Sequence, residues 1–148
     1  MKRALKYGAL VTGIIVVYVA LKHWGLHLDP VRAAVIDTAV FNLAALVGLS
    51  LGISERRAAN QGLLSFGEGM QTGVCIAIAY AALTALYFAI LLLAVGPAIM
   101  QQSGEVNANG EVTGAVIAKA FAGVLIGMTV IGTILSLFVS LVLRRKAL

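Results

Sequence analysis

The sequence predicts an all-α integral membrane protein, built as an antiparallel bundle of four transmembrane helices. Of its 148 residues, 61% are hydrophobic and 11% are charged, whereas a soluble domain has about 45–50% apolar and about 25% charged residues. Four long apolar segments alternate with charged stretches along the chain. Such segments are stable in lipid only as helices, because a bilayer offers no partner to an unpaired backbone N–H or C=O.

The four predicted spans lie within one membrane domain that covers residues 1–148. They are residues 7–26, 31–53, 72–95 and 115–143, with a cytoplasmic loop over 54–71 and an outer loop over 96–114. The first span follows a basic start, but no small-residue cleavage site precedes Trp24, so we interpret it as a retained helix and not as a signal peptide. Pro30 opens the second span, where its missing N–H costs little.

The third span is preceded by a helix start signal and followed by a stop signal. Ser65 and Glu68 have the spacing of a capping box, so we expect a helix to begin near Phe66 and to continue into the span. Gly96 and Pro97 end it. The fourth span, at about 1.5 Å per residue, is longer than a roughly 30 Å hydrocarbon core requires, so we expect it to tilt or to protrude.

The distribution of Lys and Arg predicts that both termini are cytoplasmic. One side of the predicted topology has eight basic residues near the ends of the spans, and the other side has three. The eight are Lys2, Arg3, Lys6, Arg56, Arg57, Arg144, Arg145 and Lys146, and the three are Lys22, Arg32 and Lys119. Basic residues beside apolar spans set orientation in a membrane. The formal charge of +5 therefore does not indicate nucleic-acid binding.

Small residues at four-residue intervals predict where the helices pack closely. Leu and lipid are equally apolar, so helices in a bilayer associate through close backbone approach, which small side chains permit. The expected packing residues are Gly48 and Gly52 in the second span, Gly73, Ala77, Ala81 and Ala85 in the third, and Gly123 and Gly127 in the fourth. We favour packing within the bundle, and the alternative is a dimerisation face. Cys75, in the third span, is expected to be a buried packing residue.

Asp37 is the principal candidate for a functional residue, because a carboxylate inside a span costs about 2.5–3.5 kcal/mol to insert. Thr38 and Asn42 follow it on the same helix, and Lys119 enters the fourth span from the same side of the membrane. An Asp37–Lys119 ion pair is geometrically possible. Two interpretations stay open: these four residues form a proton or ion relay or a small polar substrate site, or Lys119 snorkels to the interface and Asp37 only sets helix register.

A metal site is not expected from the sequence. His23 and His27 are four residues apart, but Gly25 interrupts the helix between them and the spacing supplies no further ligand, so they are weak candidates. The sequence contains no nucleotide-binding loop, thiol redox motif or protease signature. We therefore expect neither a cofactor nor an enzymatic activity.

Two segments carry a resemblance to a known family. They are Leu5-Lys6-Tyr7-Gly8-Ala9-Leu10 with Gly13, at the start of the first span, and Ser65-Phe66-Gly67-Glu68-Gly69-Met70-Gln71-Thr72-Gly73, which leads into the third. Together with the plan of four spans, they resemble the bacterial membrane family called domain of unknown function 4199 (DUF4199). The resemblance implies a four-helix protein of the bacterial inner membrane. It supplies no activity and no site residues.

Two functional hypotheses follow from these observations. The first is an accessory, scaffold or assembly component of a bacterial inner membrane, whose partners are the lipid bilayer and either further copies of the chain or a larger membrane protein. The second is a small oligomeric transporter or channel, in which Asp37, Asn42 and Lys119 line a path together with Thr38. Spans rich in Ala, Gly and Leu, with few polar groups, favour the first hypothesis.

Overall fold

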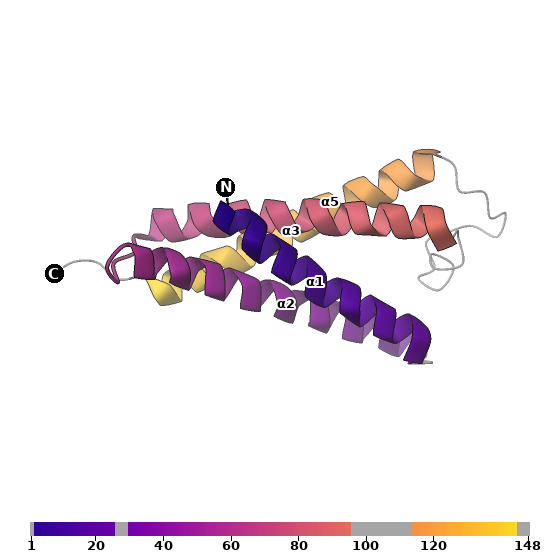
Figure 1. The fold of residues 1–148 in the computed structure, drawn as a ribbon, viewed down its shortest axis with the longest axis horizontal. Helices are drawn as coiled ribbons and strands as arrows, with labels where there is room; N and C mark the ends of the chain where they lie inside the picture. Colours follow the sequence, from indigo (N-terminus) through magenta and orange to yellow (C-terminus); the bar gives the residue numbers. More distant parts are fainter. Residues whose placement is uncertain (1, 26–29, 96–113, 145–148) are drawn as a thin grey trace.

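The computed structural model describes residues 2–25, 30–95 and 114–144 of the chain. Four helices contain most of these residues: α1 spans Lys2–Gly25, α2 Pro30–Ala59, α3 Phe66–Val95 and α5 Gly114–Leu143. They share one long axis, and the start of α1 and the end of α5 point toward the same end of the molecule (Figure 1). Each helix is long and apolar enough to cross a membrane, so the predicted all-helical fold of four apolar helices is confirmed.

Helix α2 is longer than its predicted span and takes up part of the segment 54–71. It continues through Ala59, so Glu55 and its neighbours lie in the last turns of a helix and not in a loop. Gln61 and Gly62 follow with positive φ angles of 56° and 84°. The N–H of Gly62 donates to the carbonyl of Arg57 (3.0 Å), which satisfies a carbonyl left unpaired at the helix end. A short link over residues 60–65 then suffices to reach α3.

The capping box expected at the start of α3 is present. The Ser65 hydroxyl accepts a hydrogen bond from the backbone N–H of Glu68 (3.2 Å), and the Glu68 carboxylate accepts one from the backbone N–H of Ser65 (3.1 Å). These two bonds satisfy donors that the first turn of a helix leaves without a partner. Helix α3 accordingly begins at Phe66, where the sequence predicted it.

Helix α3 is the central helix of the bundle, because it packs against α1, α2 and α5. Its buried residues include a row of small ones, since Gly73, Ala77, Ala81 and Ala85 are all buried. Helix α1 also packs on α2, and α2 on α5, whereas within the described ranges no contact joins α1 to α5. Cys75 is exposed on α3 and not buried as expected, because it lies off this row.

Two glycines of α2 allow α1 and α3 to approach closely. A Cβ atom at Gly48 would collide with Val11 of α1, and one at Gly52 would collide with Ile76 of α3. Both glycines are buried. They lie where the sequence placed a packing pair, in the half of α2 near Ala59.

The contact between α3 and α5 depends on a glycine from each helix. Gly73 of α3 lies against the buried Ser136 of α5, and Gly132 of α5 lies against Tyr80 of α3. The Tyr80 hydroxyl donates to the carbonyl of Met128 (3.0 Å), so the buried phenol has the partner that burial requires. A side chain at Gly132 would displace this ring.

The first half of α5 packs less tightly than the second. The buried residues of the helix are Gly132, Ser136, Val139 and Ser140. A Cβ atom at Gly123 or Gly127 would meet nothing within 4 Å, so these two glycines do not form the close contact that we expected of them. The reason is visible in Figure 1, where α5 diverges from α1 and α2 toward its start. Gly132 supplies the close contact instead.

Replacement of Gly132 by Ala is expected to destabilise the bundle by about 1–3 kcal/mol, the usual cost of overpacking a tight contact. The matched substitution Gly127→Ala adds the same methyl group to the same helix in open space. It should leave stability unchanged or raise it slightly, because Ala is the better helix former. Thermal unfolding of the two variants in detergent measures the difference. Equal midpoints would contradict the packing described above.

Candidate functional site

Asp37 is paired with two side chains of α1. Its carboxylate accepts hydrogen bonds from the Tyr18 hydroxyl (2.7 Å) and from the Lys22 ammonium group (2.6 Å). Tyr18 and Lys22 are four residues apart, so both lie on the face of α1 that meets α2. The Lys22 and Asp37 side chains are 28% and 30% exposed. The ion pair therefore lies at the edge of the bundle, with its charges largely shielded by protein.

The structure corrects the pairing of Asp37 that the sequence allowed. Lys119 is exposed on α5, and among the described residues no ion pair joins it to Asp37, whose cationic partner is Lys22. Two features explain the difference. The short connection from Gly25 to Pro30 brings the end of α1 beside the start of α2, while the first half of α5 diverges from α2 (Figure 1).

The remaining two candidate residues do not complete a polar path. The Asn42 side chain donates to the carbonyl of Thr38 on its own helix (2.8 Å), a local bond that links it to no other helix. Thr38 is exposed. The structure thus brings Asp37 to α1, keeps Asn42 bonded to α2 and leaves Lys119 on the outward side of α5. The four candidates therefore do not come together at one place.

A second carboxylate cluster, which the sequence analysis missed, joins α1 to α2 at the opposite end of the pair. The Glu55 carboxylate accepts hydrogen bonds from Lys6 (2.9 Å), from Arg3 (3.3 Å) and from the Tyr7 hydroxyl. Lys6 and Tyr7 belong to one of the two segments that carry the family resemblance. The sequence does contain a signal for this cluster, because the spacing of Arg3, Lys6 and Tyr7 places them on one face of a helix. The cluster was missed because residue 55 was assigned to a loop.

Glu68 connects α2 to α3 across the link at the same end. Beyond its role in the capping box, its carboxylate accepts a hydrogen bond from Asn60 (3.0 Å) and lies 3.6 Å from the Arg56 guanidinium. The neighbouring Arg57 donates from Nε to the carbonyl of Gly62 (3.2 Å). This end of the bundle, which we call the basic end, has six described cations: Lys2, Arg3, Lys6, Arg56, Arg57 and Arg144.

Polar contacts also occur between α1 and α3 in the middle of the bundle. The hydroxyl groups of Thr12 and Thr84 lie 3.2 Å apart, and Thr84 is completely buried. Each hydroxyl thus has a partner inside an apolar environment, where an unpaired group would be costly. The pair belongs to neither carboxylate cluster, and it fixes the position of α1 against α3.

The structure assembles no site for a metal ion in the part of the chain that it describes, since no group of three or more His, Cys, Asp or Glu residues was found there. His23 belongs to α1, and His27 lies outside the described residues. Cys75, the single cysteine, is exposed on α3.

The fold and these clusters define a protein of four apolar helices held together by small-residue contacts and by two carboxylate clusters between α1 and α2. A family model described as "Protein of unknown function (DUF4199)" matches residues 6–145. The chain belongs to this family, as its resemblance implied. No curated protein and no solved structure matches the chain.

The two segments that resemble the family have structural roles at the basic end. Tyr7 bonds to Glu55, and a Cβ atom at Gly8 would collide with Ala79 of α3. In the other segment, Glu68 forms the capping box, and Gly69 lies against Ser140 of α5. Both segments therefore contribute to helix packing and to helix ends.

A double-mutant cycle tests which cation is coupled to Asp37. The stability losses of Asp37→Asn and Lys22→Gln are expected to be non-additive by about 1 kcal/mol, because each substitution breaks the same ion pair. The losses of Asp37→Asn and Lys119→Gln should add, since those side chains do not touch. Thermal unfolding of the single and double variants in detergent measures the stability losses that each comparison requires. Coupling of Asp37 to Lys119 and not to Lys22 would refute the arrangement described.

Proposed function

We propose that the chain is a multi-pass protein of a bacterial inner membrane, with both termini in the cytoplasm, that acts without catalysis as an accessory, scaffold or assembly component. Four apolar helices and membership of DUF4199 support the location. The orientation is supported by the basic end, because cations beside apolar spans favour the cytoplasmic side. In this proposal the chain works by packing its helices against those of a membrane partner.

The first half of α5 is the observation that carries this proposal. From Gly114 to Ile131 the helix has no buried residue, and its exposed positions include Ala118, Ala122 and Gly123. Elsewhere the helices expose large side chains such as Leu93 and Val142, whereas the first exposed large apolar residue of α5 is Ile126. Lys119 is also exposed on this surface, but the small side chains beside it let another helix come close. This surface therefore suits a helix of a partner protein.

Native mass spectrometry of the protein extracted from its own membrane in mild detergent tests the proposal. We expect the chain to be extracted together with a membrane protein partner. The double substitution Gly123→Leu with Gly127→Leu should reduce the amount of this complex at least tenfold, because two Leu side chains separate the helix backbones. Ala82→Leu, also an exposed small residue but on α3, is the matched control and should retain it. A partner held equally by all three forms, or none at all, would count against the proposal.

A second candidate function is proton or ion transport by an oligomer, and the Asp37 cluster is the observation that favours it. A carboxylate paired with Lys22 and Tyr18 inside a predicted span is the kind of group that relays protons in membrane proteins. The geometry supports this candidate less well, because Asn42 and Lys119 do not extend the cluster into a path.

The transport candidate predicts that Asp37→Asn abolishes a flux measured in proteoliposomes while the bundle stays folded. Removal of the carboxylate charge leaves no group to carry the proton, so the rate should fall at least tenfold. The control is Asn42→Ala, which removes only a bond within α2 and should retain the flux. If the wild-type protein shows no flux under a pH gradient or with alkali-metal ions, transport is rejected.

A further inference from the structure

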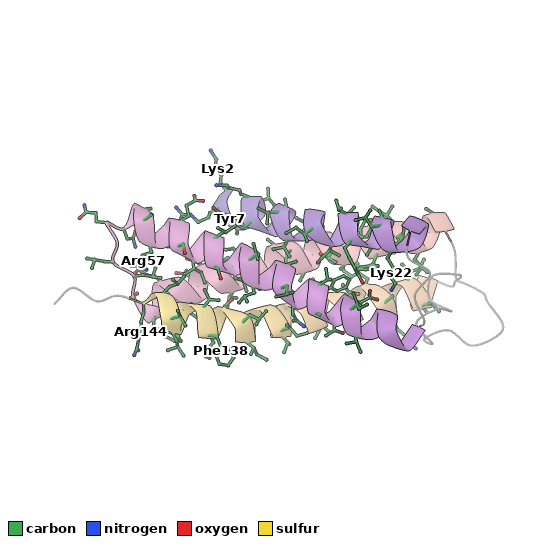
Figure 2. The ribbon with its side chains drawn as sticks, turned by 90° about the horizontal axis from the view of Figure 1, so that it is seen from below. Lys2, Tyr7, Lys22, Arg57, Phe138 and Arg144 are labelled. Atoms are coloured by element: carbon green, nitrogen blue, oxygen red, sulfur yellow. The ribbon has the colours of Figure 1, made fainter. Side chains whose placement is uncertain are left out.

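We propose that the basic end is a binding surface for anionic phospholipid headgroups, formed by Lys2, Arg57 and Arg144. The inference rests on the proposed insertion in a membrane and goes beyond it, because it names the lipid chemistry that these side chains select. The three residues come from α1, α2 and the residue that follows α5. Figure 2 shows all three toward the end of the bundle opposite Lys22.

These three cations differ from their neighbours in having no carboxylate partner among the described residues. Glu55 pairs with Arg3 and Lys6, and Glu68 with Arg56. Within the described residues, no ion pair involves any of the other three cations of the basic end. Six cations and two carboxylates leave this end with four net positive charges. The three unpaired residues supply three of these charges, and the fourth arises because Arg3 and Lys6 share the single carboxylate of Glu55.

The local surroundings of these cations place them at the depth of a headgroup. Lys2 is one turn from Leu5, which is 62% exposed, and Arg144 directly follows the last turn of α5, where Val142 is 81% exposed. An apolar side chain exposed to that extent is stable in hydrocarbon, so the cation one turn away lies at the boundary with water. Lys and Arg at this boundary extend toward phosphate groups.

Arg57 has the geometry of a preorganised phosphate ligand. Its Nε donates to the carbonyl of Gly62 (3.2 Å), which holds the guanidinium group against the end of α2. The two terminal nitrogens remain for another acceptor, and a guanidinium fork matches the oxygens of a phosphate. The link that provides the carbonyl contains the exposed Leu63, so this group also lies beside an apolar surface.

The arrangement favours a lipid surface over an acidic protein or a nucleic acid. Lys2 and Arg144 extend from opposite sides of the bundle, and Arg57 lies between them at its end (Figure 2). A protein or a nucleic acid would need cations gathered on one face or along one groove. Lipid headgroups surround the whole perimeter of a membrane protein, so cations spread around one end can each reach one.

The test is titration of the detergent-solubilised full chain with phosphatidylglycerol, followed by native mass spectrometry at low ionic strength. Each of Lys2→Gln, Arg57→Gln and Arg144→Gln is expected to weaken phosphatidylglycerol binding roughly fivefold, which corresponds to about 1 kcal/mol per cation. The triple variant should lose at least fiftyfold. The matched control is Lys119→Gln, an exposed cation on the first half of α5, and it should change binding less than twofold.

Two further binding measurements, with phosphatidylcholine and with inorganic phosphate, identify the ligand. Phosphatidylcholine, which has a phosphate but no net charge, should bind weakly and equally to the wild-type protein and the triple variant. Inorganic phosphate at millimolar concentration should not displace phosphatidylglycerol. The inference is overturned if the triple variant binds phosphatidylglycerol as the wild type does, if Lys119→Gln costs as much as a variant of the basic end, or if inorganic phosphate competes fully.

Extraction of the native membrane with alkaline carbonate separates failure of this inference from failure of the proposed function. A chain that is released into the soluble fraction is not an integral protein, and both proposals then fail. A chain that stays in the membrane but shows no preference for phosphatidylglycerol contradicts only the headgroup surface. Raised salt should weaken the wild-type preference, because exposed charges are screened over about 10 Å at 0.1 M ionic strength.

Discussion

Because lipid solvates Leu and Ile as well as another helix does, the four helices gain association energy mainly where α3 lets a neighbouring backbone come close. Gly73 and the buried alanines of α3 have small side chains, so a neighbouring helix can approach its backbone over several turns. The close approach then brings polar groups within reach of one another, including the Tyr80 hydroxyl and the carbonyl of Met128. A large side chain in place of Gly73 or one of these alanines would separate the helices and leave those groups unpaired inside an apolar environment.

The α1–α2 pair is held by a different kind of interaction. Asp37 and Glu55, near the two ends of α2, each pair with a Lys and a Tyr of α1. Two separated attachments prevent one helix from rotating or sliding against the other, since either movement would break at least one of them. Removal of Lys22 would leave the partly shielded charge of Asp37 without a cation, which costs more than the pair contributes.

Hydropathy was sufficient to predict the four helices, because the length of an apolar run reports directly on whether it can cross a bilayer. The start of α3 was predictable for a similar reason: the capping box is a local interaction between Ser65 and Glu68. Neighbours in space were harder to predict. Depth in the membrane alone made Lys119 a suitable partner for Asp37, and only the path of the helices shows that Lys22 is the one in contact.

The packing glycines illustrate the same limit. A four-residue interval marks Gly123 and Gly127 as capable of close contact, but it does not report which part of α5 lies against α3. Gly132 is outside that interval and makes the contact. Glu55 was assigned to a loop because the apolar run ends near Ile53, while the helix itself continues to Ala59. Hydropathy marks the end of a span, and backbone hydrogen bonds mark the end of a helix.

The pairing of Asp37 with Lys22 has a consequence for the order in which the chain is built into a membrane. Both residues belong to helices that are synthesised before α3 and α5, so this hairpin contains the counterion for its own carboxylate. Its insertion does not have to wait for α3 or α5 to offset the cost of that charge. A carboxylate whose partner lay on α5 would instead stay uncompensated until α5 was translated. In the membrane location that we propose, the α1–α2 hairpin can therefore enter the bilayer as an independent unit, on which α3 assembles later.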